Sequence, residues 1–391
     1  MLEQEKNSIT EAARQQMNSL GKAAWEAYRD LQNIRAAEIF ANALKIAEST
    51  HDTRAIVYYR FCQGASLIEA GKLKQALTVL TPTLRDRKIE GEPEDVYRTL
   101  TRYIDIAIGL PISLATIEHS FTHTENYLRE SGHYDWRHRL LYLRAVLYTA
   151  RGMYHEALSA AQEGWTLLRN EHPSWTRDTH LDNVVEICLR LRDVELARKY
   201  LVEWETLEND MPKEREAKLC IRNSELARLK VEKHTAVDWA RKAMLIAEQV
   251  DSEEVRFLAV CTLLRAFLFV GEVQLANNMI GRLIIMRHSE RKNYLFTIHL
   301  LRGDYYLACI RQIVGMNPAD SEYGLEFPLP ARIADIKATC RMMVRARHAY
   351  DAALKVGQWI DEQLQCNWRQ GEVSKRYAQI ESIENLLERL T

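Results

Sequence analysis

The sequence of 391 residues is poor in the two residues that interrupt regular structure, with only 15 glycines and 8 prolines. Proteins built from strands and tight turns use both residues often, so this scarcity argues against such a fold. Charge of one sign is also missing, because the net charge is only −1. Nucleic-acid-binding proteins usually carry a basic surplus that neutralises phosphates, so the composition disfavours a nucleic-acid partner.

The seven cysteines form no C-x-x-C pair, and their number is odd. Several stand among Leu, Ile and Val, which is typical of buried thiols in a reducing compartment and not of disulfides or a zinc site. The most apolar run, FLAVCTLLRAFLFV (257–270), is too short to span a bilayer and carries Arg265. The opening MLEQEKNSITEAARQQ lacks the apolar core of a secretion signal. We therefore expect a cytoplasmic protein without a membrane segment.

Motifs of common catalytic and cofactor sites are missing: the sequence has no G-x-G-x-x-G, no phosphate loop and no G-x-S-x-G. We therefore expect no enzyme activity and no cofactor. One alternative is a metal-dependent enzyme, because His119 and His123 would share one face of a helix and could bind a metal with a third ligand. Since H-E-x-x-H is absent, we interpret them as an ordinary histidine pair and predict no metal site.

What the sequence does contain is a repeated phrase centred on an alanine, as in GKLKQALTVL and GMYHEALSA. The intervals between successive phrases are 39 to 42 residues. The aligned residues are Ala37, Ala76, Ala115, Ala157, Ala197, Ala236 and Ala276. Turn residues such as Gly91-Glu92-Pro93 and Asp251-Ser252 recur between the phrases with the same period. Two independent signals that share one period indicate a structural repeat.

Each repeat holds two segments of helical periodicity, as in RHRLLYLRAVLYTA followed by YHEALSAAQEGWTLL. Two antiparallel helices approach closely only where a side chain is small, so the alanine marks their crossing point. One such hairpin cannot bury its apolar face alone, and neighbouring hairpins must stack on one another. The sequence therefore predicts an all-α solenoid of stacked antiparallel helical hairpins, in which the segment Asp251-Ser-Glu-Glu254 caps the start of one helix.

The turn formed by Gly152, Tyr154, Ala157 and Leu158 resembles that of the tetratricopeptide repeat (TPR). The units of about 40 residues are longer than the usual 34 and are similar to those of bacterial TPR regulators and peptide sensors. The repeats at Ala115 and Ala197 lack the turn glycine. The resemblance implies a right-handed α-solenoid, a TPR-like superhelix, in which the first helix of each unit lines a concave groove.

The repeat pattern predicts three parts of the chain. Residues 1–290 would form an array of about seven units, and residues 291–330 an irregular helix followed by a proline-containing loop. Residues 331–391 would form helices that cap the open end of the core, since terminal repeats of solenoids are atypical. The loop at 316–330 is interpreted either as an insertion or as part of the binding site, because long loops are often functional.

The implied groove carries the candidate binding residues. Counting back from the aligned alanines places mostly apolar side chains there in repeats two and three, namely Tyr58, Phe61, Tyr97, Leu100 and Ile104. In repeats four to seven the same positions are mostly charged: Arg139, Tyr142, Asp182, Glu186, Arg190, Lys218, Glu225, Arg228 and Arg265. Basic residues are in slight excess, which favours an acidic or carboxylate-bearing ligand.

The functional hypothesis is a non-catalytic, regulatory scaffold or adaptor that binds a protein or peptide segment in this groove. The alternative is a ligand-gated regulator, in which a small molecule or signalling peptide changes the pitch of the superhelix. A solenoid permits such a change because each unit contacts only its neighbours.

Overall fold

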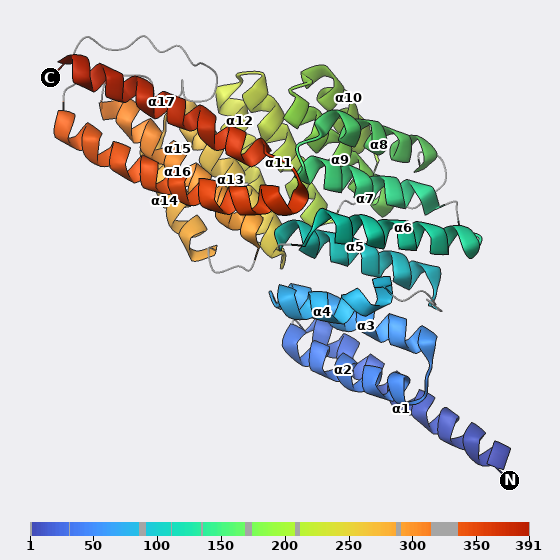
Figure 1. The fold of residues 1–391 in the computed structure, drawn as a ribbon. Coiled ribbons are helices and arrows are strands. Elements are labelled where there is room, and N and C mark those ends of the chain that lie inside the picture. Colours follow the sequence, from blue (N-terminus) through green and yellow to red (C-terminus); the bar gives the residue numbers. More distant parts are fainter. Residues whose placement is uncertain are drawn as a thin grey trace. The chain divides into compact units, whose positions relative to one another are not determined.

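The computed structural model describes residues 2–30, 32–85, 91–110, 112–133, 136–168, 174–207, 212–286, 291–313 and 335–390. Within these ranges the regular elements are seventeen α-helices (Figure 1). The chain divides into two compact units, Met1–Leu143 and Arg144–Thr391. The all-α fold expected from the sequence is confirmed.

The first unit contains six helices and the beginning of a seventh. They are α1 (Leu2–Arg29), α2 (Asn33–Ser49), α3 (Thr53–Glu69), α4 (Leu73–Arg85), α5 (Pro93–Gly109), α6 (Leu114–Glu130) and the first half of α7 (Arg137–Ala150). Consecutive helices from α1 to α6 pack against each other, and α3 also packs on α5 while α4 packs on α6. Two rows of helices therefore run through this unit, as expected for stacked hairpins.

The second unit continues the pattern and ends with three longer helices. Its members after α7 are α8 (Tyr154–Leu168), α9 (Ser174–Leu191), α10 (Val194–Glu205), α11 (Lys213–Leu229), α12 (Lys233–Ala247), α13 (Glu253–Val270), α14 (Val273–Ile285), α15 (Lys292–Ile313), α16 (Ile336–Leu364) and α17 (Trp368–Leu390). The odd-numbered helices α9, α11, α13 and α15 pack side by side in one row. Helix α16 pairs with α15, and α17 packs on both.

The alanine phrase occupies the same place in nearly every hairpin. The fourth residue of each second helix, from α2 to α14, is Ala36, Ala76, Ile117, Ala157, Ala197, Ala236 or Ala276, and each is fully buried. Two alignments were therefore wrong: Ala36 replaces Ala37, and Ile117 replaces Ala115, whose side chain is exposed. The misplaced Ala115 also affected the groove positions counted back from it, since Leu100 and Ile104 lie in the core.

Local signals fix where helices begin. Pro93 stands at the start of α5, where its missing N–H costs nothing, and the hydroxyl of Ser252 accepts the amide N–H of Val255 at the start of α13. The cap expected within Asp251–Glu254 is thus confirmed, and its capping residue is Ser252. Helix α13 contains the longest apolar run and is buried along most of its length. It is therefore the central helix of a hydrophobic core in the second unit.

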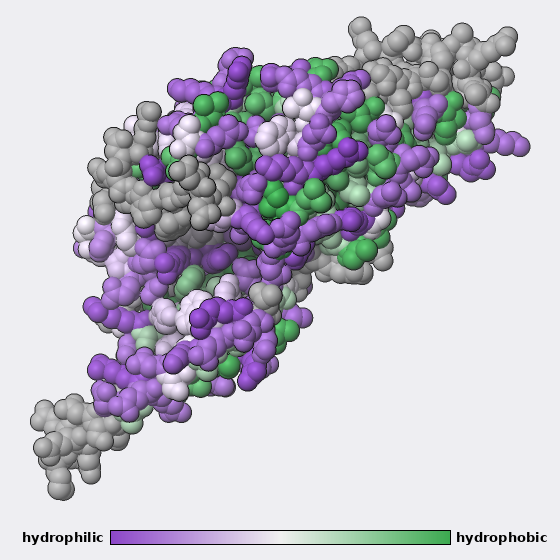
Figure 2. All heavy atoms as spheres, turned by 180° about the vertical axis from the view of Figure 1, so that it is seen from behind, coloured by the Kyte–Doolittle hydropathy of each residue, from purple (hydrophilic) through white to green (hydrophobic). Residues whose placement is uncertain are grey.

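Polar residues cover most of the face shown in Figure 2, with apolar residues gathered between them. Apolar side chains that stay exposed include Leu245 of α12 and Ile285 of α14. No helix in the described part of the chain combines the length and hydrophobicity that a bilayer span requires. The sequence boundary at 290 stays a prediction, and the expected loop at 316–330 lies outside the described residues.

Candidate functional site

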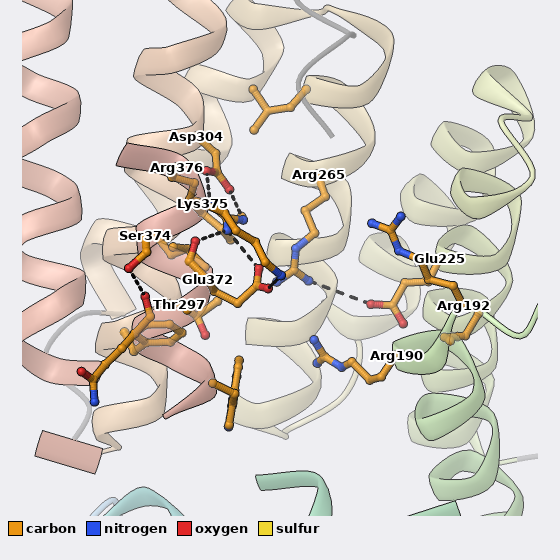
Figure 3. A pocket seen from close by; sticks show the side chains of 18 of the residues that line it. Arg190, Arg192, Glu225, Arg265, Thr297, Asp304, Glu372, Ser374, Lys375 and Arg376 are labelled. Carbon is orange, nitrogen blue, oxygen red and sulfur yellow. Dashed lines mark hydrogen bonds and ion pairs between the residues drawn. The ribbon is translucent and has the colours of Figure 1, made fainter. Parts of the chain in front are cut away.

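A cavity of about 1020 Å³ opens in the second unit, between the odd-numbered helices and α17. One wall is formed by α9, α11, α13 and α15, with Tyr154 of α8, and the other by the first three turns of α17. Figure 3 shows side chains from both walls directed toward the same space. The first helices of successive repeats therefore line a concave site, as the TPR resemblance implies.

The charged lining of this cavity is predominantly basic. Its cationic side chains are Arg190, Arg192, Arg228, Arg265, Lys375 and Arg376, whereas its carboxylates are Glu225, Asp304 and Glu372. The remainder combines leucines from α9, α11, α13 and α15 and aromatic rings with uncharged polar side chains such as Thr297, Ser374 and Gln379. Apolar contacts together with converging polar and charged groups are typical of a ligand site.

The structure divides the nine sequence-predicted groove residues into three groups. Arg190, Glu225, Arg228 and Arg265 line the cavity. Asp182, Glu186 and Lys218 lie on the same helices, α9 and α11, but do not line it. Arg139 and Tyr142 lie on α7 in the first unit and do not line it either.

The acidic residues of α9 and α11 surround a buried arginine that sequence reasoning missed. Arg222 donates from Nε to Asp182 at 2.7 Å, from Nη2 to Glu186 at 2.7 Å and from Nη1 to Glu225 at 3.2 Å. The side chain of Arg222 is only 5% exposed, so these are shielded, charge-assisted hydrogen bonds. Although burial lowers the pKa of Arg222, the three carboxylates raise it well above its usual value.

This network also fixes the ionisation of Glu186. Burial alone would raise the pKa of its carboxyl group, but Arg222 and Arg190 lower that pKa to about 2. Arg190 donates to Glu186 at 3.3 Å from the next turn of α9. The sequence did contain a signal for Arg222, because it follows Asp182 by 40 residues, which is one repeat. An acidic and a basic residue that occupy the same position in neighbouring repeats come to lie side by side in the fold.

The positive charge of Arg265 is weakly compensated by nearby carboxylates. Its nearest carboxylate oxygen, on Glu225, is 3.9 Å away, which is beyond the range of a charge-assisted hydrogen bond. Glu225 is shared, since its other oxygen accepts from Arg222. Burial lowers the pKa of Arg265, and the charges of Arg228 and Arg190 lower it further. The surroundings of Arg265 in the folded protein therefore disfavour its positive charge.

Helix α17 contributes residues that the sequence did not assign to the site. Asp304 of α15 accepts two hydrogen bonds from Arg376, at 2.7 and 3.2 Å, and one from the buried Tyr350 at 2.9 Å. Glu372 accepts from Lys375 at 2.7 Å and from Arg376 at 3.0 Å. Partners 46 or 72 residues apart share no repeat position, so no sequence signal could reveal them.

The two remaining groove candidates occupy a different environment. The guanidinium of Arg139 donates to Glu94 at 2.6 Å and lies over Trp136, 4.2 Å from the ring centroid, and over Tyr97 at 5.3 Å. Tyr142 is half-buried one turn further along α7. Arg139 is thus held within the first unit by an ion pair and two aromatic rings.

The possible metal pair does not assemble into a site. The imidazole rings of His119 and His123 are stacked with centroids 6.5 Å apart on α6. Nowhere in the described ranges do three His, Cys, Asp or Glu side chains come together as metal ligands. The pair therefore has no third ligand among the described residues.

No protein-family model matches this sequence, and no curated protein matches it. Solved structures that match this chain include the following three. A Rap protein complexed with competence and sporulation factor has a TM-score of 0.55 and 11% identity, over 97% of this chain and 99% of that chain. The apo quorum sensor NprR from B. thuringiensis has a TM-score of 0.47 and 12% identity, over 92% and 98%. A tetratricopeptide repeat protein from Parabacteroides merdae has a TM-score of 0.39 and 14% identity, over 90% and 98%.

The similarity to the Rap protein extends over nearly the whole of both chains, although few residues are identical. At this identity the likeness concerns the fold and not the activity. The chain is a TPR-like helical array.

Proposed function

We propose that this chain is a non-catalytic regulatory scaffold whose cavity in the second unit binds an acidic peptide or protein segment. The excess of basic over acidic side chains in the lining supports an anionic ligand. The volume is at the upper end of the range for small-molecule sites, which suits an extended segment of a polypeptide. The Rap protein of similar fold was solved with a bound factor, which agrees with a ligand held by such an array.

The observation that carries this proposal is the weakly compensated positive charge of Arg265. The side chain of Arg265 is partly buried, at 24% exposure, and its single carboxylate neighbour is distant, so its charge lowers the stability of the folded protein. A charge that costs stability is expected where it serves binding. A ligand carboxylate placed beside Arg265, Arg190 and Arg228 would supply the missing negative charge. The proposal includes a cytoplasmic location, which the free thiols, four of them buried, support.

Fluorescence anisotropy with a labelled peptide that carries four glutamates tests this function. The Arg265→Met variant keeps most of the buried volume but removes the charge. We expect its affinity for the peptide to fall at least about tenfold, since a shielded, charged hydrogen bond is worth about 1.5–3 kcal/mol. Its melting temperature should stay unchanged or rise, because a partly buried, weakly compensated charge is removed and Glu225 still accepts a hydrogen bond from Arg222.

The matched control is Lys218→Met on α11. Lys218 was also predicted in the groove, but it does not line the cavity and lies between Glu214 at 3.8 Å and Glu254 at 3.9 Å. This variant should bind the peptide as the wild type does. A peptide with four glutamines should bind weakly to all three proteins. Equal affinity of wild type and Arg265→Met for the acidic peptide would refute the proposed site.

A further inference from the structure

The end of α16, the turn that follows it and the start of α17, residues 361–370, form a corner. Within it, the carboxylate of Asp361 is fully buried and accepts the amide N–H groups of Arg369 at 3.1 Å and Gln370 at 3.2 Å. The same carboxylate accepts from the guanidinium of Arg369 at 2.9 Å. Because it satisfies the first free amides of α17, Asp361 fixes the direction in which this helix leaves the corner.

This corner docks on the turn at the C-terminal end of α7, more than 200 residues earlier in the chain. The indole Nε1 of Trp368 donates to the carbonyl oxygen of Ala150 at 2.9 Å, and Arg369 donates to the same oxygen at 3.1 Å. In return, Nε of Arg151 donates to the carbonyl oxygen of Leu364 at 3.1 Å. Each helix end thus has a carbonyl without an intrahelical partner, and the other segment supplies the donor.

Gly152 makes the docking possible. Its φ of +75° turns the chain between α7 and α8, and a Cβ atom there would lie 2.7 Å from the indole of Trp368. Gly71 stands at the equivalent turn between α3 and α4 with a φ of +72°, but nothing lies within 4 Å of a Cβ atom at that position. The same repeat position therefore has a contact in one hairpin that it lacks in the other.

We infer that the corner is a tether that joins the last hairpin of the second unit to its first, and thereby fixes the width of the cavity between them. In a solenoid each repeat contacts only its neighbours, so its curvature is soft unless distant elements are joined. Tyr154, directly after the docked turn, and Trp368, in the corner itself, both line the cavity. Docking therefore positions two parts of the cavity wall at once.

This inference rests on the proposed function where it concerns ligand binding. A ligand that contacts both α17 and the odd-numbered helices stabilises the docked state, and docking raises the affinity for that ligand by the same factor. The tether would make the site ligand-gated. The two cavity walls separate when the corner is undocked, and a bound ligand holds them together. The chemistry of the ligand is the acidic segment proposed above.

Hydrogen exchange measured by mass spectrometry on the whole protein tests the tether without any ligand. In Gly152→Ala the new methyl group excludes Trp368, so amides of residues 148–154 and 364–372 should exchange at least about tenfold faster than in the wild type. The control is Gly71→Ala, which has the same backbone strain and no clash. It should leave exchange in both segments unchanged.

A second variant keeps the test decisive if Gly152→Ala does not fold. Arg151→Met retains the aliphatic part of the side chain and removes the hydrogen bond to Leu364, so exchange should rise in the same two segments by a smaller factor. Unchanged exchange in the folded variants would overturn the tether.

Binding of the four-glutamate peptide tests the coupling. We expect Gly152→Ala to bind it about tenfold more weakly than Gly71→Ala, although neither glycine lines the cavity. If exchange accelerates while the affinity stays at the wild-type value, the tether does not set the cavity and the inference is wrong. If the wild type itself does not bind the peptide, the proposed function fails, and the exchange result alone decides whether the tether exists.

Discussion

Arg222 shows how one residue can order several others. Three carboxylates from two helices are held by its guanidinium, and all four side chains are largely withdrawn from water. Removing one partner from a buried ion pair leaves an uncompensated charge, which is far more costly than losing an exposed pair. Asp182, Glu186 and Glu225 therefore act first as ligands of Arg222.

The lowered pKa of Glu186 gives a prediction for stability against pH. Its folded pKa is about 2 and its ordinary value is 4.5, so its ionisation stabilises the fold fully above pH 4.5. That contribution is lost as the pH falls toward 2. The difference in unfolding free energy between wild type and Glu186→Gln, from urea titrations followed by circular dichroism, should shrink between pH 5 and about pH 2.

The control is Glu214→Gln on α11, where the carboxylate is about half exposed and 3.8 Å from Lys218. Its effect on the unfolding free energy should be small throughout, because exposed ion pairs contribute at most about 1 kcal/mol. A difference between wild type and Glu186→Gln that stays constant with pH would contradict the lowered pKa.

The residue scale is also where sequence reasoning reached its limit. Periodicity placed Arg190, Arg228 and Arg265 on one side of the first helices, and the cavity contains all three. Periodicity says nothing about which charge is compensated, because that depends on distances between helices. Lys218 has two carboxylates within 4 Å and Arg265 has one, and the sequence does not show this difference.

Helices in this molecule pair where a small residue lets them approach closely. Within the repeats, the sequence alone shows where most of these small residues are. The recurring alanine located the crossing point of most hairpins to within one residue, because each second helix begins three residues before it. The hairpin of α5 and α6 was misplaced by two residues, since Ile117 fills the position that alanine has elsewhere.

Glycine has the same role outside the repeats, where α15 meets α16. A Cβ atom on Gly303 would overlap the ring of Tyr350, which cannot turn aside because its hydroxyl donates to Asp304. We predict that Gly303→Ala lowers the unfolding free energy by about 1–3 kcal/mol despite alanine's higher helix propensity. Urea denaturation followed by circular dichroism measures this change.

Gly281 in α14 provides the matched comparison, because nothing lies within 4 Å of a Cβ atom there. Gly281→Ala should raise the unfolding free energy by about 0.5–1 kcal/mol, the usual gain of alanine over glycine in a helix. Stabilisation by both substitutions would show that α15 and α16 are not closely packed at Gly303.

The position of α17 was beyond the reach of the sequence. From the sequence, we interpret this terminal amphipathic helix as a cap. Its pattern specifies one apolar face but not the surface that covers that face. Part of α17 forms a wall of the cavity, through contacts with residues 72 and 218 positions away. Such pairings carry no period and cannot be derived from the repeat.

At the scale of the whole molecule, a net charge of −1 coexists with a cavity in which cationic side chains outnumber carboxylates. Binding of an acidic segment should therefore depend on local attraction and be sensitive to salt. We predict that affinity for the four-glutamate peptide falls at least about tenfold between 50 and 500 mM NaCl, as the Debye length shortens. Anisotropy titrations at several salt concentrations measure this dependence. An affinity that is independent of salt would indicate that apolar contacts dominate.

The ion pairs of Arg222 have a consequence for how this array can change in evolution. In arrays of identical units, a unit can be duplicated, removed or exchanged, because every boundary is the same. The boundary between α9 and α11 is different, since Arg222 on one repeat requires Asp182 and Glu186 on the repeat before it. Removing or transposing either repeat would leave a buried charge without its partners, so we expect these two repeats to stay together and in this order in related chains.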